Sequence, residues 1–356
     1  MEASNVLVSV IVIGFNGRPY LPRTLEALAN QTLCRREHVE IILVDNASTD
    51  GTIKLVRDQF PDVLPIGLSE NIGYYRAFER AAENARGRFV VVMPQDMLAH
   101  EECLAELVRP ALADPRVGVV VPSIINPGSE VYEQLRLSGH VEGYGKFYIS
   151  SLGQVRYSTG RDGRCSLTLA TIGPLLFNRK LREECGFYFD PGWSHYAGDW
   201  EAGLRAALLG YLPVWNPESV VYHLGEEDKR QLDVGVLARY ATGARDQFLV
   251  YYKLTGRREF LLTLPLLCAG LPAKALELRT TRALRAGLAI ASVCALPFVL
   301  VAAFLKRGSV ESSRQAMERS RRAPPGWLLR SLLAPPRMVR WEDESAARSG
   351  SAGAQD

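Results

Sequence analysis

The stretch from Glu40 to Thr52 constrains the fold of this chain more than any other part of its sequence. An apolar run that ends at Val44 is followed directly by short polar residues, of which the first are Asp45 and Asn46. Such runs are typical of strands buried in a parallel sheet, and these sheets bind ligands just beyond the carboxyl ends of their strands. Asp45 and Asn46 are therefore expected at a ligand site. The alternative is a turn in which Asp50 or Ser48 caps the helix that begins near Thr52.

Strand-like runs alternate with helix-like segments over the first 122 residues. Strands are expected at residues 6–13, 40–44, 63–68, 89–93 and 117–122, and helices at 19–31, 52–59, 73–86 and 104–113. This alternation predicts an α/β fold with a doubly wound sheet. Residues 124–171 are rich in Gly, Ser and Tyr, and we expect irregular or antiparallel structure there. Helical and α/β patterning returns at 180–184 and 199–210.

Polar residues follow the first four expected strands. They are Gly14–Gly17, Asp45–Asn46, Asn71–Gly73 and Pro94–Asp96. Parallel strands bring such ends together at one edge of the sheet, so the four segments predict a single ligand site. The chain has neither a glycine-rich dinucleotide fingerprint after its first strand nor a P-loop, which disfavours a dinucleotide cofactor and P-loop NTPase chemistry.

The composition separates an acidic front from a basic back. The chain has 356 residues and a formal net charge of +3, yet residues 274–340 hold thirteen Lys/Arg against three Asp/Glu. We therefore expect the back to meet an anionic partner. The six cysteines are scattered, which suits a reducing compartment, and the first eight residues do not predict a cleaved secretory signal.

Three segments together resemble family 2 inverting glycosyltransferases, which have the GT-A fold. They are Val8–Gly17, Val44–Thr52 and Glu70–Gly73, and the resemblance covers roughly residues 6–225. Relatives with this Asn-Ala-Ser-Thr-Asp-Gly motif are often rhamnosyltransferases of surface polysaccharides. The resemblance implies a mixed doubly wound sheet flanked by helices, and an enzyme that moves a sugar from a nucleoside diphosphate donor.

The same resemblance implies a donor site and a metal site. It places Phe15 and Asp45 at the nucleotide base, and Asn16, Asn46, Asn71 and Gly73 around the donor. Asp96 matches the aspartate that binds Mg²⁺ or Mn²⁺ on the donor diphosphate, and His223 matches a second ligand of that metal. Pro94 replaces the family's usual first polar residue. The alternatives are a helix N-cap for Asp96 and an ordinary surface or core histidine for His223.

The acceptor side is implied by Gly198–Arg205, which resembles the family segment that carries the general base. Asp199 matches this base, and an inverting transfer needs such a carboxylate beside the acceptor hydroxyl. Gly198 replaces a usual glutamate. We expect Trp193, His195, Trp200 and Glu201 to bind the acceptor. The alternative is that Asp199 and Glu201 are first-turn acids favoured by the helix dipole.

The region after residue 237 is expected to be helical and basic, and to associate with a membrane. Ala286–Leu305 has no charge and is long enough to span a bilayer, whereas Phe260–Ala273 is interrupted by Pro265 and Pro272. The flanking arginines disfavour a simple crossing, so we expect helices in the membrane interface. The alternative is a buried hairpin of a soluble dimer.

These inferences divide the chain into residues 1–237, a catalytic domain, residues 238–340, the helical region, and residues 341–356, a disordered tail. Within the catalytic domain, 1–122 is expected to bind the nucleotide and 123–237 the acceptor. The predicted enzyme works at the cytoplasmic face of the cell membrane on a surface glycan or lipid-linked acceptor, without nucleic acid, and a homodimer is left open. A glycan-binding pseudoenzyme and a sugar nucleotidyltransferase are the alternatives.

Overall fold

The computed structural model describes most of the chain. The described residues are 5–125, 146–150, 152, 155–158, 166–168, 173–193, 197–224, 234–276 and 282–333. His195 and the predicted tail at 341–356 lie outside them, as do most residues of the predicted irregular region.

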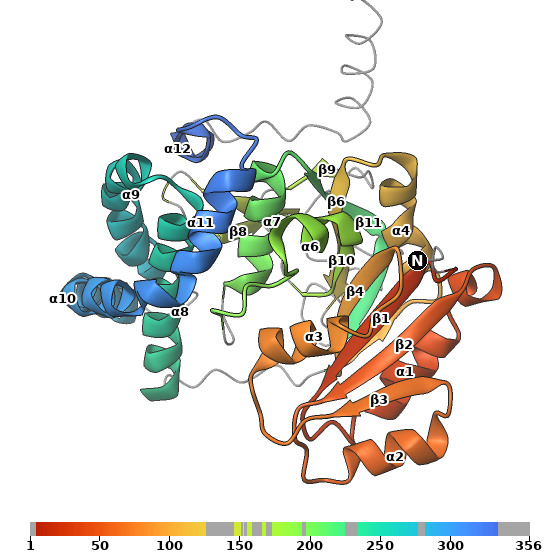
Figure 1. Ribbon diagram of the computed structural model, residues 1–356. Helices are drawn as coiled ribbons and strands as arrows, with labels where there is room; N and C mark the ends of the chain where they lie inside the picture. The colour runs from red at the N-terminus through yellow and green to blue at the C-terminus, as the bar shows by residue number, and fades with distance from the viewer. Residues whose placement is uncertain are drawn as a thin grey trace, which may run out of the picture.

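A mixed sheet forms the centre of the first two thirds of the chain (Figure 1). Its strands are β1 (Val8–Gly14), β2 (Val39–Asp45), β3 (Val63–Gly67), β4 (Phe89–Pro94), β5 (Met97–Ala99), β6 (Val117–Ile125), β9 (Ser166–Leu167), β10 (Leu175–Asn178) and β11 (Leu212–His223). The order is β3-β2-β1-β4-β10-β6-β11-β5, with β9 paired to β11. Neighbours among β1 to β4 are parallel, whereas β10 is antiparallel to both β4 and β6. The predicted doubly wound mixed sheet is confirmed.

Helices cover both faces of the sheet because alternate strand residues point to opposite sides. In β1, Val10 and Val12 pack in one core with α1 (Leu21–Ala29), α2 (Thr52–Gln59) and α4 (Cys103–Ala113). Ile11 and Ile13 pack in the other core, with α3 (Tyr74–Ala82), α6 (Arg179–Cys185) and α7 (Gly198–Leu208). Continuous burial on both faces explains why these strands are almost wholly apolar.

The C-terminal helices extend the second core. They are α8 (Val234–Leu254), α9 (Arg257–Leu276), α10 (Arg282–Lys306), α11 (Glu311–Ser320) and α12 (Trp327–Leu333), with the short 3₁₀ helix η2 (Arg307–Val310) between α10 and α11. Buried residues of all five helices belong to the same apolar cluster as the sheet face under α3. The helical region therefore packs directly on the part of the chain that carries Asp199 (Figure 1).

One local expectation is corrected and one alternative is excluded. Helix α9 runs through Pro265 and Pro272 without a break, because it packs beside α8 and α10 along its length. Asp96 does not cap a helix: β5 follows it directly, and α4 starts only at Cys103. The remaining short elements are the 3₁₀ turn η1 (Thr32–Arg35) and an antiparallel hairpin of β7 (Lys146–Ile149) and β8 (Val155–Ser158).

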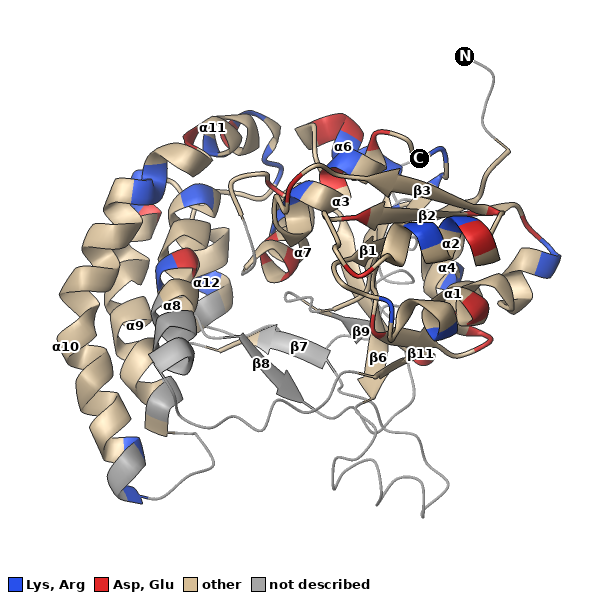
Figure 2. Cartoon of the chain, turned by 90° about the horizontal axis from the view of Figure 1, so that it is seen from below, with Lys and Arg blue, Asp and Glu red and all other residues tan. Residues whose placement is uncertain are grey.

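One side of α10 leaves large apolar side chains exposed. Ile290, Val293, Phe298, Val301, Phe304 and Leu305 are between 55% and 77% exposed. Their spacing follows the helical period, so they form a stripe along α10. Arg285–Ser320 contains one helix that is long and apolar enough to cross a membrane, by length and composition alone. Figure 2 shows α10 without charge along its middle and with basic residues near both ends.

Candidate active site

The loops after β1 and β2 hold each other in place at the carboxyl edge of the sheet. Gly14 pairs with Asp45 in the parallel ladder, so both loops leave the sheet at the same level. Asn16 has a positive φ of 48°. Its backbone N–H donates to Ser48 Oγ at 2.8 Å, and its side-chain oxygen accepts from the Thr49 N–H at 3.0 Å. Asn16 thus braces the two loops, and Asp45 is only 3% exposed with its carboxylate bonded to Ser48.

Gln95 fixes the backbone of Phe15. Its side-chain oxygen accepts from the Phe15 N–H at 2.8 Å, and its side-chain nitrogen donates to the Phe15 carbonyl at 3.1 Å. The Phe15 ring is left 45% exposed above the sheet edge. A pre-positioned, exposed aromatic ring can stack on a base. The sequence reading overlooked Gln95, although its place beside the expected metal residue Asp96 was a signal.

The turn before α3 is organised by two asparagines. Asn46 donates to Asn71 Oδ1 at 2.9 Å and accepts from the Ile72 N–H at 3.0 Å. Asn71 also accepts from the N–H of Gly73, whose φ of 86° suits a glycine at the start of α3. Asn46 is 3% exposed, so in this structure its polar groups serve the turn.

The fourth strand end and the last strand meet at Asp96 and His223. Asp96 Oδ2 lies 3.1 Å from His223 Nε2, and both side chains are about one third exposed. The hydrogen bond to Asp96 is the main cause that raises the pKa of His223, against the opposing effect of burial. A carboxylate oxygen beside an imidazole nitrogen fits a Mn²⁺ ion, and Mg²⁺ less well. Among the described residues, no group of three or more ligating side chains occurs.

Asp199 lies in the first turn of α7, against the start of α3. Burial raises the pKa of its carboxyl to about 6, and hydrogen bonds from the N–H groups of Trp200 and Gly173 and from the Tyr75 hydroxyl oppose this rise. Burial and the negative charges of Asp199 and Asp96 raise the pKa of Tyr74. The charges of both carboxylates therefore raise the pKa of the same tyrosine. The predicted general base and the predicted metal site thus lie in the same region.

The position of the Tyr75 ring explains why Gly198 stands where the family usually has a glutamate. A Cβ atom on Gly198 would lie 2.7 Å from the Tyr75 ring, so a glutamate could not occupy this position without moving that ring. The Tyr75 hydroxyl accepts hydrogen bonds from the N–H groups of Gly198 and Asp199. The two tyrosines directly after Gly73 were a signal that the sequence reading did not use.

Two of the expected acceptor residues are corrected by their burial. Trp193 is fully buried in the core, and Glu201 is fully buried within an ion network, so neither side chain is available to an acceptor. Trp200 is 9% exposed and packs near Tyr251, with ring centroids 6.2 Å apart. Asp199 is the acid of this turn that stays partly accessible. The period of α7 places position 201 towards α8.

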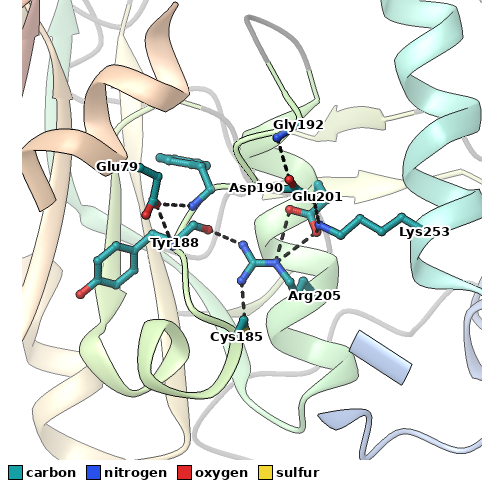
Figure 3. A network of polar contacts seen from close by, with 9 residues as sticks. Glu79, Cys185, Tyr188, Asp190, Gly192, Glu201, Arg205 and Lys253 are labelled. Atoms are coloured by element: carbon teal, nitrogen blue, oxygen red, sulfur yellow. Dashed lines mark hydrogen bonds and ion pairs between the residues drawn. The ribbon is translucent and has the colours of Figure 1, made fainter. Parts of the chain in front are cut away.

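The ion network joins α7 to the C-terminal region (Figure 3). Lys253 Nζ of α8 lies 2.7 Å from Asp190 Oδ2 and 2.7 Å from Glu201 Oε1. Arg205 Nε lies 3.1 Å from the same Glu201 oxygen, and its guanidinium also donates to the Tyr188 carbonyl. Burial is the largest single effect on the pKa of Asp190 and would raise it. The charge of Lys253, together with hydrogen bonds from Lys253, Gly192 and Ser313, holds that pKa below its usual range.

The part of the chain that carries the first strand ends matches a known family. Residues 9–172 match the model of glycosyl transferase family 2. Over these residues the chain is similar to that family. It is a glycosyltransferase that transfers a sugar from a nucleotide-sugar donor.

Two relatives are glycosyltransferases by name. The glycosyltransferase is 26% identical over 239 residues to the N-acetylglucosaminyl-diphospho-decaprenol L-rhamnosyltransferase of Mycobacterium tuberculosis. The aligned residues cover 61% of this chain and 76% of the relative. It is 35% identical over 94 residues to the putative teichuronic acid biosynthesis glycosyltransferase TuaG of Bacillus subtilis, over 25% of this chain and 36% of TuaG.

Solved structures confirm the fold of the glycosyltransferase. GalNAc-T7 in complex with UDP, GalNAc and Mn²⁺ aligns with a TM-score of 0.64 and 15% identity, over 94% of this chain and 57% of that longer chain. TarS residues 1–349 of S. aureus, in complex with UDP, align with a TM-score of 0.52 and 16% identity, over 89% of this chain and 92% of that chain. At these identities the likeness establishes the GT-A-like fold alone.

Replacing Lys253 with methionine should destabilise the glycosyltransferase. The Lys253→Met variant leaves Asp190 and Glu201 buried without their shared cation, which we expect to lower the free energy of unfolding by about 3–5 kcal/mol. Urea unfolding followed by circular dichroism measures the change. In the control, Lys54→Met, the lost pair is solvent-exposed, so the expected change is below about 1 kcal/mol. Equal stability of the two variants would contradict the assignment.

Proposed function

We propose that the enzyme is an inverting glycosyltransferase in which Asp199 is the general base. The observation that carries this proposal is the placement of a largely buried carboxylate, with a pKa of about 6, beside the region of Asp96 and His223. A base with this pKa is ionised at neutral pH yet accepts a proton readily. The acceptor hydroxyl would lose its proton to Asp199 as its oxygen attacks the anomeric carbon, opposite the departing diphosphate.

The donor would lie along the carboxyl edge of the sheet. In this proposal Phe15 stacks on the nucleotide base. Asp45 accepts a hydrogen bond from the nucleotide base after the Ser48 hydroxyl, its present donor, moves away. Asn16, Asn46, Asn71 and Gly73 shape the loops that surround the nucleotide rather than contacting it through free polar groups. Residues 1–122 then form the nucleotide-binding half and residues 123–237 the acceptor half.

Asp96 and His223 would hold a divalent metal, with Mn²⁺ favoured over Mg²⁺ by the imidazole ligand. When bound, the metal supplies positive charge to the donor diphosphate. The structures of GalNAc-T7 and of the mannosyltransferase PcManGT from Pyrobaculum calidifontis, each solved with Mn²⁺, agree with this choice.

The acceptor would be lipid-linked, and the enzyme would work at the cytoplasmic membrane surface. The exposed apolar stripe of α10 and its flanking basic residues fit a helix that lies in the membrane interface. The mycobacterial relative, named for a diphospho-decaprenol acceptor, supports a glycan on a diphosphate-linked polyprenol. Residues 238–340 would then keep the catalytic domain at the membrane, and a rhamnosyl donor is the first to test.

The role of Asp199 is tested by release of nucleoside diphosphate from UDP-, dTDP- and GDP-sugars with Mn²⁺ and a membrane lipid extract. Asp199→Asn should lower kcat by about 10²–10⁴ because the amide cannot accept the proton. For the wild type, kcat should fall about tenfold per pH unit well below the pKa of about 6, since only the carboxylate is active. Asp58→Asn, an exposed carboxylate on α2, is the control. Full activity of Asp199→Asn would remove this residue from the mechanism.

The metal site is tested by titrating Mn²⁺ into protein treated with EDTA. His223→Ala should raise the Mn²⁺ concentration for half-maximal activity by about 10–100-fold because one ligand is lost. The matched control is His38→Ala, an exposed histidine that precedes β2. An unchanged Mn²⁺ requirement in the His223 variant would assign the metal to other ligands.

The membrane role of α10 is tested by flotation with vesicles that contain phosphatidylglycerol. The double variant Phe298→Asp and Phe304→Asp places two charges on the exposed stripe, and we expect at least about a tenfold weaker vesicle affinity. Leu112→Asp changes an exposed leucine of α4 and should leave flotation unchanged. Flotation of the double variant like the wild type would show that the stripe does not enter the membrane.

A further inference from the structure

Two cationic side chains converge on one buried carboxylate at the C-terminal end of α10. Asp246 of α8 is fully buried, with Arg245 NH2 2.7 Å and Lys306 Nζ 3.8 Å from its Oδ1 atom. The Arg245 and Lys306 side chains remain 23% and 27% exposed. They can therefore still reach a ligand, whereas Asp246 cannot.

Arg76 of α3 adds a third positive charge. Burial lowers the pKa of Lys306, the charge of Asp246 opposes this, and the charges of Arg245 and Arg76 lower the pKa further, so all four groups lie within electrostatic reach. Arg76 Nε donates to the carbonyl of Pro191 at 2.9 Å, which leaves the rest of its guanidinium at the surface. We call Arg76, Arg245 and Lys306 the basic cluster.

The basic cluster carries more positive charge than Asp246 neutralises. Arg245 and Lys306 share this one carboxylate, and Arg76 adds a further positive charge that acts on Lys306, so an anion with two or more charges would complete the site. Guanidinium groups match the oxygens of phosphate in pairs, and an ammonium group adds a point charge. A diphosphate therefore fits the charge and the donor chemistry of the cluster better than a single carboxylate does.

The basic cluster lies between the apolar stripe of α10 and the loop that leads from Asp190 to Asp199. Phe304 and Leu305, the last members of the stripe, directly precede Lys306. The next turn, η2, packs on the loop that begins at Asp190, since a Cβ atom on Gly192 would lie 2.8 Å from the Ser309 carbonyl oxygen. Arg76 follows Tyr75, the hydrogen-bond partner of Asp199. A molecule with an apolar chain, a diphosphate and a sugar would meet these features in that order.

We propose that the basic cluster binds the diphosphate of a lipid-linked acceptor and thereby presents the acceptor sugar to Asp199. This inference rests on the proposed function, and it names the group that distinguishes the acceptor from a free glycan. It also assigns the excess positive charge at the end of α10 to substrate recognition rather than to membrane attraction alone.

The test is binding of phytanyl diphosphate in neutral detergent micelles, measured by isothermal titration calorimetry on the full chain, with phytanol as the uncharged reference. The wild type should bind the diphosphate at least about tenfold more tightly than phytanol, as expected for charge-assisted hydrogen bonds. Lys306→Gln should lose most of this preference. The double variant Arg245→Gln and Asp246→Asn, which removes a buried charge together with its partner, should lose it too.

Two controls separate this site from others. Arg80→Gln changes an exposed arginine of the same helix as Arg76 and should bind like the wild type. Asp96→Asn weakens the proposed donor site, so retained diphosphate binding in this variant would place the ligand outside that site. Thermal melting of every variant checks that the fold is intact.

Three results would overturn the proposal. One is equal binding of phytanyl diphosphate and phytanol by the wild type, and another is loss of the preference in Asp96→Asn but not in Lys306→Gln. The third is competition by phosphatidylglycerol micelles with the same affinity, which would assign the cluster to a membrane head group. Donor cleavage is measured separately, so failure of the transferase reaction itself remains distinguishable from failure of this site.

Discussion

The buried ammonium group of Lys253 connects the two functional parts of the molecule. A cation that is wholly removed from water must be compensated, and here Asp190 and Glu201 compensate it from two sides. Asp190 begins the loop that leads to α7, and Glu201 is two residues beyond Asp199 on that helix. Displacing α8 would therefore leave charges unpaired beside the base. The position of Asp199 thus depends on a residue of the C-terminal helices more than fifty positions away.

This dependence makes the C-terminal helices part of the packing that positions Asp199. One apolar core runs from the sheet face beneath α3 through α7 to α8, α9 and α10. The outer side of α10 is apolar and exposed, and its inner side contributes Val299 and Ala303 to that core. A helix that meets the membrane on one side and the catalytic domain on the other would hold the active site at a defined height above the lipid.

At the carboxyl edge of the sheet, several motif residues form hydrogen bonds between loops. Their polar groups were expected to bind a ligand instead. Gln95 fixes Phe15, Asn16 links two loops, and Asn46 holds the turn at Asn71. Preorganisation of this kind reduces the entropy that a flexible nucleotide site would lose on binding. Pro94 fits this arrangement, because it ends β4 and lets the following glutamine reach back to the first loop.

The pattern of residues along the chain was enough to predict the mixed sheet and the strand ends at which polar residues gather. Apolar runs with polar ends predict parallel strands whose ends converge, and in the sheet Gly14 pairs with Asp45 and Ile13 with Pro94. Which of the residues near Asp199 are buried depends on contacts between segments that are far apart in the sequence. Trp193 and Glu201 stand beside Asp199 in sequence but are buried, because the partner of Glu201 is Lys253 of a distant helix. Local patterns encode secondary structure, whereas the pairing of a buried charge depends on which distant segment packs against it.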